Sequence, residues 1–192
     1  HEYNNTRHSP VFTAGKSFPV PVQDFNRVLG DLAVIKGEAE RIGLAFGPEQ
    51  KGRLIEIGRP SPGQMRISIV KKSNAETFGI EEMSPSGQIV KDIPDNGVIF
   101  VGSDTWVEGV LPRGKSLTIA AQSPSTEAQK ARIILGRDDV TYQAYDGSSV
   151  LGLIAEGNIE LMRDSEGNLS APSGSDMETL RIDAALMSQS GR

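Results

Sequence analysis

Cysteine is absent from this 192-residue sequence, and its only two histidines are His1 and His8. The lack of cysteine excludes disulfide scaffolds, thiolate zinc sites, iron–sulfur clusters and cysteine nucleophiles. Because both histidines lie near the start, a catalytic triad or a histidine-rich metal site inside the fold has no histidine to use. We therefore expect no catalytic residue of these classes and no cofactor.

Long apolar runs are also missing. No segment approaches the roughly 20 apolar residues that cross a bilayer, and no signal peptide is visible, so we predict no membrane insertion by this segment. The sequence contains 21 glycines and 11 prolines, which favours turns and short elements over long helices. A hydrophobic fraction of 37% is enough for a packed core.

The pattern divides the chain into residues 1–48, an irregular segment plus one helix at about 22–42, and a β-rich region at 49–192. Pro21 precedes the helix and Gly43 ends it. Apolar residues recur at three- and four-residue steps along one side of this amphipathic helix, namely Val22, Phe25, Val28, Leu29, Leu32, Ile35, Ala39 and Ile42.

From residue 53 onward the apolar period changes to two, which predicts short strands separated by turn-forming clusters of Gly, Pro, Asn and Asp. The turn at 60–63 separates the first two strands. The predicted strands are 54–57, 65–69, 88–90, 98–101, 105–107, 117–120, 132–135, 140–142, 151–155, 159–161 and 180–182.

Two stretches, 101–107 and 154–161, share one pattern: an apolar strand, a tight corner with Gly and Asp or Asn, then a second strand. We attribute the corner residues to a left-handed backbone. Repeated strand–corner–strand units are typical of a β-solenoid, in which each coil buries its apolar row on its neighbours. The fold class is thus mainly β, a helix followed by a solenoid-like stack; an antiparallel β-sandwich gives similar alternation and is the alternative.

The segments 97–101, 104–109, 117–121, 150–159 and 180–187, with the helix 21–42, resemble PilX-type pilus-assembly proteins. These are large minor pilins and related bacterial surface proteins, some competence-associated, that carry a β-solenoid module. The resemblance covers roughly 16–192 and is best at 96–187. It implies an extracellular, cell-surface location in a type IV pilus context, with other pilus or surface subunits as partners. Since the long assembly helix of pilins is absent, the match is to the exposed module.

The resemblance implies a non-enzymatic display and adhesion module that contacts DNA, as in DNA uptake, or a surface polysaccharide.

The charge pattern offers a polyanion-binding strip, because six basic residues and one acid between 51 and 72 give a local net charge of +5. A solvated basic hairpin is the simpler interpretation. Trp106 is a candidate exposed aromatic contact, although a lone tryptophan in a strand more often belongs to the core. The strip residues are Lys51, Arg53, Arg59, Arg66, Lys71 and Lys72.

Carboxylates are the remaining candidates for chemistry. The rival hypothesis is a β-helical polysaccharide lyase or hydrolase with paired acids, drawn from Asp138 with Asp139, Asp104 with Glu108, Glu156 with Glu160, or Asp164 with Glu166. We expect Glu108, Glu156 and Glu160 to be solvated charges and assign no catalytic residue. Asp138 and Asp139 are weak calcium candidates, because only two adjacent oxygen ligands are visible. A third hypothesis is a structural spacer or filament subunit without a ligand.

Overall fold

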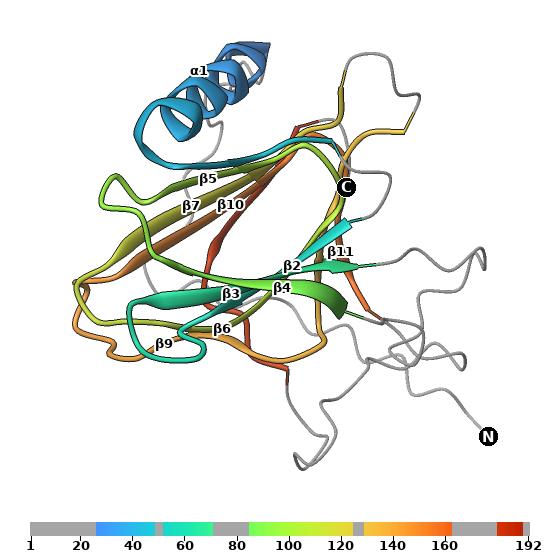
Figure 1. Ribbon diagram of the computed structural model, residues 1–192. Helices are drawn as coiled ribbons and strands as arrows, with labels where there is room; N and C mark the ends of the chain where they lie inside the picture. The colour runs from blue at the N-terminus through green and yellow to red at the C-terminus, as the bar shows by residue number, and fades with distance from the viewer. Residues whose placement is uncertain (1–25, 49–51, 71–84, 125–128, 163–179, 190–192) are drawn as a thin grey trace, which may run out of the picture.

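The structure is a computed structural model that describes residues 26–48, 52–70, 85–124, 129–162 and 180–189. In these ranges the chain forms one helix, α1 (Asn26–Ile42), and is otherwise mainly β, which confirms the predicted class (Figure 1). The strands are β1 (Leu44–Phe46), β2 (Gly52–Ile57), β3 (Gln64–Val70), β4 (Pro85–Asp92), β5 (Val98–Val101), β6 (Thr105–Leu111), β7 (Ser116–Ala121), β8 (Ile133–Leu135), β9 (Val140–Tyr142), β10 (Val150–Ala155), β11 (Ile159–Leu161) and β12 (Ala185–Ser188).

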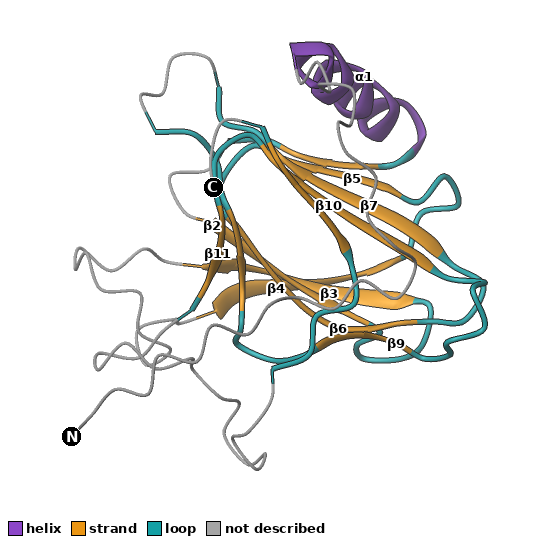
Figure 2. Cartoon of the chain, turned by 180° about the vertical axis from the view of Figure 1, so that it is seen from behind, coloured by secondary structure: helices purple, strands orange, loops and turns teal. Residues whose placement is uncertain are grey.

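The strands form two facing sheets (Figure 2). The five-stranded sheet has the order β1-β5-β7-β10-β12, and each of its ladders is parallel. The seven-stranded sheet has the order β11-β8-β6-β2-β3-β4, with β9 also on β6, and is antiparallel only along β2-β3-β4. From β5 onward the chain crosses between the sheets, and each new strand lies parallel beside an earlier one.

The corners that join the sheets are stacked by backbone hydrogen bonds. The N–H of Gly102 donates to the carbonyl of Phe46 at 2.9 Å, and that of Gln122 to Val101 at 3.0 Å. Gly102 has no positive φ, so the left-handed explanation for its glycine is wrong. Glycine is required because a Cβ there would lie 2.7 Å from the nitrogen of Pro48 in the adjacent corner.

The core fills the space between the sheets with alternate side chains from most of the strands. Parallel register aligns these inward rows, as in the Val98–Val101 and Ser116–Ala121 pair, where Ile99 lies beside Ile119. Residues of this core with almost no exposure include Ile55, Ile57, Met65, Ile67, Ile99, Leu111, Ile119, Ile133 and Leu153.

The helix covers the outer face of the five-stranded sheet (Figure 1). Leu32 and Ala39 are buried there against Phe100 and Ala120, and helical spacing places Leu32, Ile35 and Ala39 on one side. The helix ends at Ile42 as predicted, whereas residues 22–25 lie outside the described residues. This packing leaves the other side of α1 facing away from the sheet.

The chain between 180 and 188 differs from the prediction. The expected strand 180–182 forms only an isolated bridge between Ile182 and Val140, and the strand is β12, three residues later. Ile182 and Ala184 pack on the core, while Ala185–Ser188 pair with β10. Two short alternating runs follow each other here, and the structure places the first beside β9 of the seven-stranded sheet and the second beside β10 of the five-stranded sheet.

Candidate functional site

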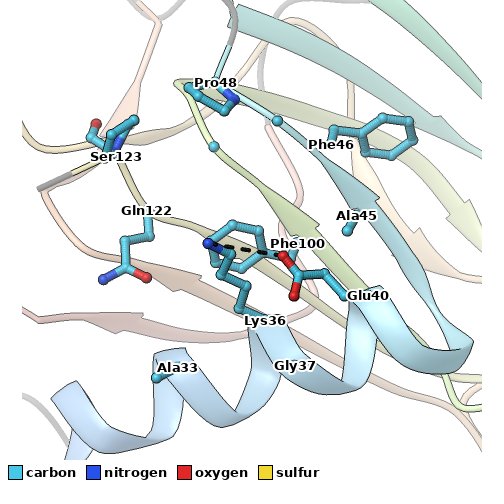
Figure 3. A pocket seen from close by; sticks show the side chains of 13 residues that line it. Ala33, Lys36, Gly37, Glu40, Ala45, Phe46, Pro48, Phe100, Gln122 and Ser123 are labelled. Carbon is cyan, nitrogen blue, oxygen red and sulfur yellow. Dashed lines mark ion pairs between the residues drawn. The ribbon is translucent and has the colours of Figure 1, made fainter.

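A pocket of about 640 Å³ lies between α1 and the corners that follow β1, β5 and β7 (Figure 3). Small residues of the helix, Ala33 and Gly37, leave room on one side, and Phe100 closes the floor. The opposite wall comes from three successive corners, 46–48, 100–102 and 122–124. The pocket therefore exists because stacked corners face a helix that touches the sheet only along its inner side.

Four groups determine the chemistry of this pocket. Lys36 Nζ lies 3.9 Å from Glu40 Oε1 and 5.7 Å from the centroid of the Phe100 ring. Figure 3 shows Lys36, Glu40 and the Gln122 side chain around the same space. The long ion pair joins two half-exposed side chains, so it is weak and leaves both groups available. An aromatic floor with a cation, a carboxylate and an amide suits a polar ligand that carries an acidic group.

A row of charged side chains crosses the outer face of the seven-stranded sheet. Arg66, Glu56 and Glu108 are neighbours on β3, β2 and β6 by strand register. Arg137 follows in the segment between β8 and β9, where its Nε and Nη2 donate to Glu108 at 2.7 and 3.0 Å. The Glu108 hydrogen bonds and its negative charge raise the pKa of Arg137 above its ordinary value, although burial acts against them.

Glu56 lies at the centre of this row and is buried. Its Oε1 is approached by Arg59 at 3.4 Å, Arg66 at 3.5 Å and Arg137 at 4.0 Å. Arg59 also donates to Asp138 Oδ2 at 2.8 Å. The arrangement is a charge-balanced network that holds β2, β3, β6 and the β8–β9 segment together.

A second network lies at the corners. Arg132 donates to Asp104 Oδ2 at 2.7 Å and to Glu160 Oε2 at 3.0 Å, which joins successive levels of the stack. Burial lowers the pKa of Arg132, but its hydrogen bonds and charge interactions with Asp104 and Glu160 are together stronger, so the pKa is raised. These groups stabilise the corners.

The structure separates the predicted basic strip. Lys51, Lys71 and Lys72 lie outside the described residues. Arg53 is buried, with its guanidinium carbon 4.5 Å from the centroid of the Phe46 ring. Arg59 and Arg66, the remaining two strip residues, point to the carboxylates described above. The described strip residues are therefore not an open row of cations.

Trp106 is not the exposed aromatic contact that the sequence suggested, since it is only 4% exposed. It lies on the outer face of β6 in a second apolar cluster with Leu54 and Ile134, whereas Val107 points into the core. Its indole Nε1 is buried and finds no hydrogen-bond partner within the described residues. Both faces of β6 are therefore buried, which the alternating pattern of its sequence does not predict.

The predicted acids are used in protein contacts wherever they are described. Besides the two networks, Glu156 accepts from the Ser123 amide at 2.9 Å, while Asp164 and Glu166 lie outside the described residues. Glu108 was expected to be solvated but is 1% exposed, because the Arg137 guanidinium lies on it. The prediction that the Glu108 carboxylate is solvated is therefore wrong.

The calcium candidates also make protein contacts. Asp138 binds Arg59 and the Asp139 amide, and Asp139 Oδ1 accepts from the Arg181 amide at 2.9 Å. Among the described residues, no three His, Cys, Asp or Glu side chains are grouped so that they could hold a metal ion.

The pocket was not predicted from the sequence. Its residues come from α1 and from corners up to about 90 positions away (Ala33 to Pro124), and no local pattern connects them. Within the described ranges, no helix has the length and apolarity needed to cross a membrane. Comparison with protein-family models, with curated proteins and with solved structures finds no match, so the resemblance to PilX-type proteins stays a prediction.

Proposed function

We propose that this chain is a non-enzymatic display and adhesion module of an extracellular, pilus-associated or cell-surface protein, built as a β-solenoid. The solenoid is supported over an antiparallel sandwich by the parallel ladders and by strands that join each sheet in chain order. Backbone hydrogen bonds between successive corners support the same view.

One observation supports a role in binding: three neighbouring corners form a wall of the pocket, and this wall faces α1. Parallel strands repeat every ~4.8 Å, so this wall offers similar backbone surfaces at regular steps. A linear polymer with repeating units matches such a wall. Lys36, Gln122 and the Phe100 ring favour an acidic polysaccharide, whose carboxylates, hydroxyls and apolar sugar faces meet a cation, an amide and an aromatic floor.

An acidic polysaccharide is favoured over DNA because Arg59 and Arg66 already pair with Glu56 and Asp138. Backbone binding to DNA needs several cations that can exchange counterions for phosphates. The enzyme hypothesis receives less support, because Asp104 and Glu108 are each paired to an arginine and buried.

The test measures binding of a uronic-acid polymer to the purified chain by biolayer interferometry, at low and high salt. Replacing Lys36 with Met should weaken binding about fivefold, the effect of about 1 kcal/mol from a half-exposed charge. The matched control is Lys91→Met on β4, an exposed lysine outside the pocket lining, which should leave affinity unchanged. Equal losses in both variants would refute the pocket as the contact site.

Two further arms separate the alternatives. Turnover of the uronic-acid polymer, with or without calcium, that disappears when Asp138 or Asp139 is replaced with Asn would support the enzyme hypothesis. Salt-dependent retention on double-stranded DNA that is lost when Arg66 is changed to Glu would support the DNA hypothesis. Labelling of unpermeabilised cells with an antibody to the full chain tests the proposed surface location.

A further inference from the structure

A glycine in the middle of α1 gives the pocket part of its width. Glycine weakens a helix interior relative to alanine, so a close packing contact usually explains it there. A Cβ added to Gly37 would meet nothing within 4 Å, so packing does not explain this glycine. Gly37 lines the pocket beside Lys36 and Glu40 (Figure 3). The glycine therefore leaves open space next to the two charged groups, and a sugar ring can fill that space.

The charges in the pocket limit how many acidic groups a ligand can place there. Among the described residues that line it, Lys36 is the single cation and Glu40 the single acid. Their Nζ and Oε1 atoms lie 3.9 Å apart, and both side chains are half-exposed. If one carboxylate of a polymer binds Lys36, a second carboxylate on the next sugar is repelled by Glu40. The formal net charge of −5 also gives the chain no general attraction for a polyanion.

Gln122 adds a neutral polar contact to the pocket. Its half-buried side chain faces the same space as Lys36 and Glu40 (Figure 3), and within the described residues its amide has no hydrogen-bond partner. An amide both donates and accepts, so it matches an acetamido group, which also has an N–H and a carbonyl. The Glu40 carboxylate only accepts, so it suits a sugar hydroxyl and not a second carboxylate.

We propose that the pocket selects a polysaccharide in which a uronic acid alternates with a neutral N-acetylated sugar, and that Glu40 sets this selectivity. This inference rests on the polysaccharide-binding function proposed above. Lys36 binds the uronate carboxylate, and Glu40 accepts a hydrogen bond from a hydroxyl of the neutral sugar. Gln122 binds the acetamido group, while Gly37 leaves room for the sugar ring.

The experiment compares two polymers of equal length. In hyaluronan oligosaccharides glucuronate alternates with N-acetylglucosamine, whereas polyglucuronate has a carboxylate on every sugar. Affinities are measured by biolayer interferometry for the purified wild-type chain, Glu40→Gln and Glu38→Gln. Glu38 is the matched control, because it lies on α1, is 44% exposed and pairs with Arg41 at 2.7 Å, but does not line the pocket.

We expect the wild-type chain to bind hyaluronan about threefold more tightly than polyglucuronate. General charge attraction would give the opposite order, because polyglucuronate carries twice as many carboxylates. Glu40→Gln should strengthen polyglucuronate binding about threefold and leave hyaluronan binding unchanged, since glutamine keeps an acceptor oxygen. Glu38→Gln should change neither. Equal wild-type affinity for both polymers, or equal gains in both variants, would overturn the proposal.

Gly37→Leu tests whether a sugar ring lies beside this glycine. The larger side chain should weaken hyaluronan binding about tenfold by filling the space. Leucine is a better helix former than glycine, so urea unfolding should show no loss of stability, and a misfolded variant would be recognised. Undiminished hyaluronan binding by this variant would overturn the proposal.

The inference and the proposed function fail in different ways. A wild-type chain that binds neither polymer refutes the polysaccharide-binding function and this inference with it. A chain that binds both polymers equally, and loses affinity in the Lys36→Met variant, keeps the proposed function and refutes only the selectivity assigned to Glu40.

Discussion

The ion pair between Arg137 and Glu108 predicts a large and burial-dependent loss of stability. Replacing Arg137 with Met keeps an apolar stem but removes the two hydrogen bonds, of 2.7 and 3.0 Å, that neutralise a side chain with 1% exposure. Removing one partner of a fully buried pair costs about 3–5 kcal/mol. Because Arg137 itself is 28% exposed, solvent screening reduces the expected loss to about 2–3 kcal/mol.

The matched control is Arg113→Met. Arg113 donates to Asp146 at 2.6 Å, an equally short contact, but its side chain is 70% exposed. We expect a loss below about 0.5 kcal/mol, as for other exposed ion pairs. The two variants thus differ in burial while the substitution and the type of partner stay the same.

The assay is equilibrium urea unfolding at pH 7, monitored by Trp106 fluorescence and by circular dichroism. The double variant Glu108→Leu with Arg137→Met should recover most of the stability, because an apolar pair leaves no buried charge without a partner. Equal losses for Arg137→Met and Arg113→Met, or no recovery in the double variant, would refute the claim that burial gives this pair its strength.

Two other predictions concern glycine and tyrosine. Gly102→Ala should lower the free energy of unfolding by about 1–3 kcal/mol, because its Cβ would lie 2.7 Å from the Pro48 nitrogen. Gly37→Ala, whose Cβ would meet no other atom, should instead stabilise α1 by about 0.5–1 kcal/mol in the same urea assay. The hydrogen bond to Asp183 raises the pKa of Tyr145 above 10.0. Its contribution to stability is therefore present below pH 10 and lost as the pH rises through the folded-state pKa. Asp183→Asn should lower that pKa, measured by NMR titration of the tyrosine ring; an unchanged value would contradict this cause.

Local sequence patterns predicted most of the secondary structure. The helix end at Ile42, the turn at 60–63 and the strands 140–142 and 159–161 follow from periodicity and turn residues over a few positions. Such signals act between neighbours in the chain, so they survive folding when nothing competes. They failed at 180–188, where the first of two adjacent runs forms only a bridge to β9 and the second pairs with β10.

Much less of the candidate site could be predicted from the sequence. The basic run is obvious in the sequence, but Arg59 meets Asp138 across 79 positions, and that pairing converts an apparent cationic strip into a neutral network. Trp106 was a candidate for an exposed contact because one face of a strand usually is exposed, whereas here it is buried in an apolar cluster beside Leu54 and Ile134. No sequence pattern predicted the pocket, because each corner contributes only a few of the residues that line it.

The amino-acid sequence by itself determined that this is a mainly β chain with one helix, because the spacing of apolar and turn-forming residues is a local property. Only the tertiary structure decided the parallel order of the strands, the partners of the buried charges and the opening between α1 and the corners. Those depend on which distant segments approach within hydrogen-bond or packing distance, and the free energy of that approach is shared across the whole core.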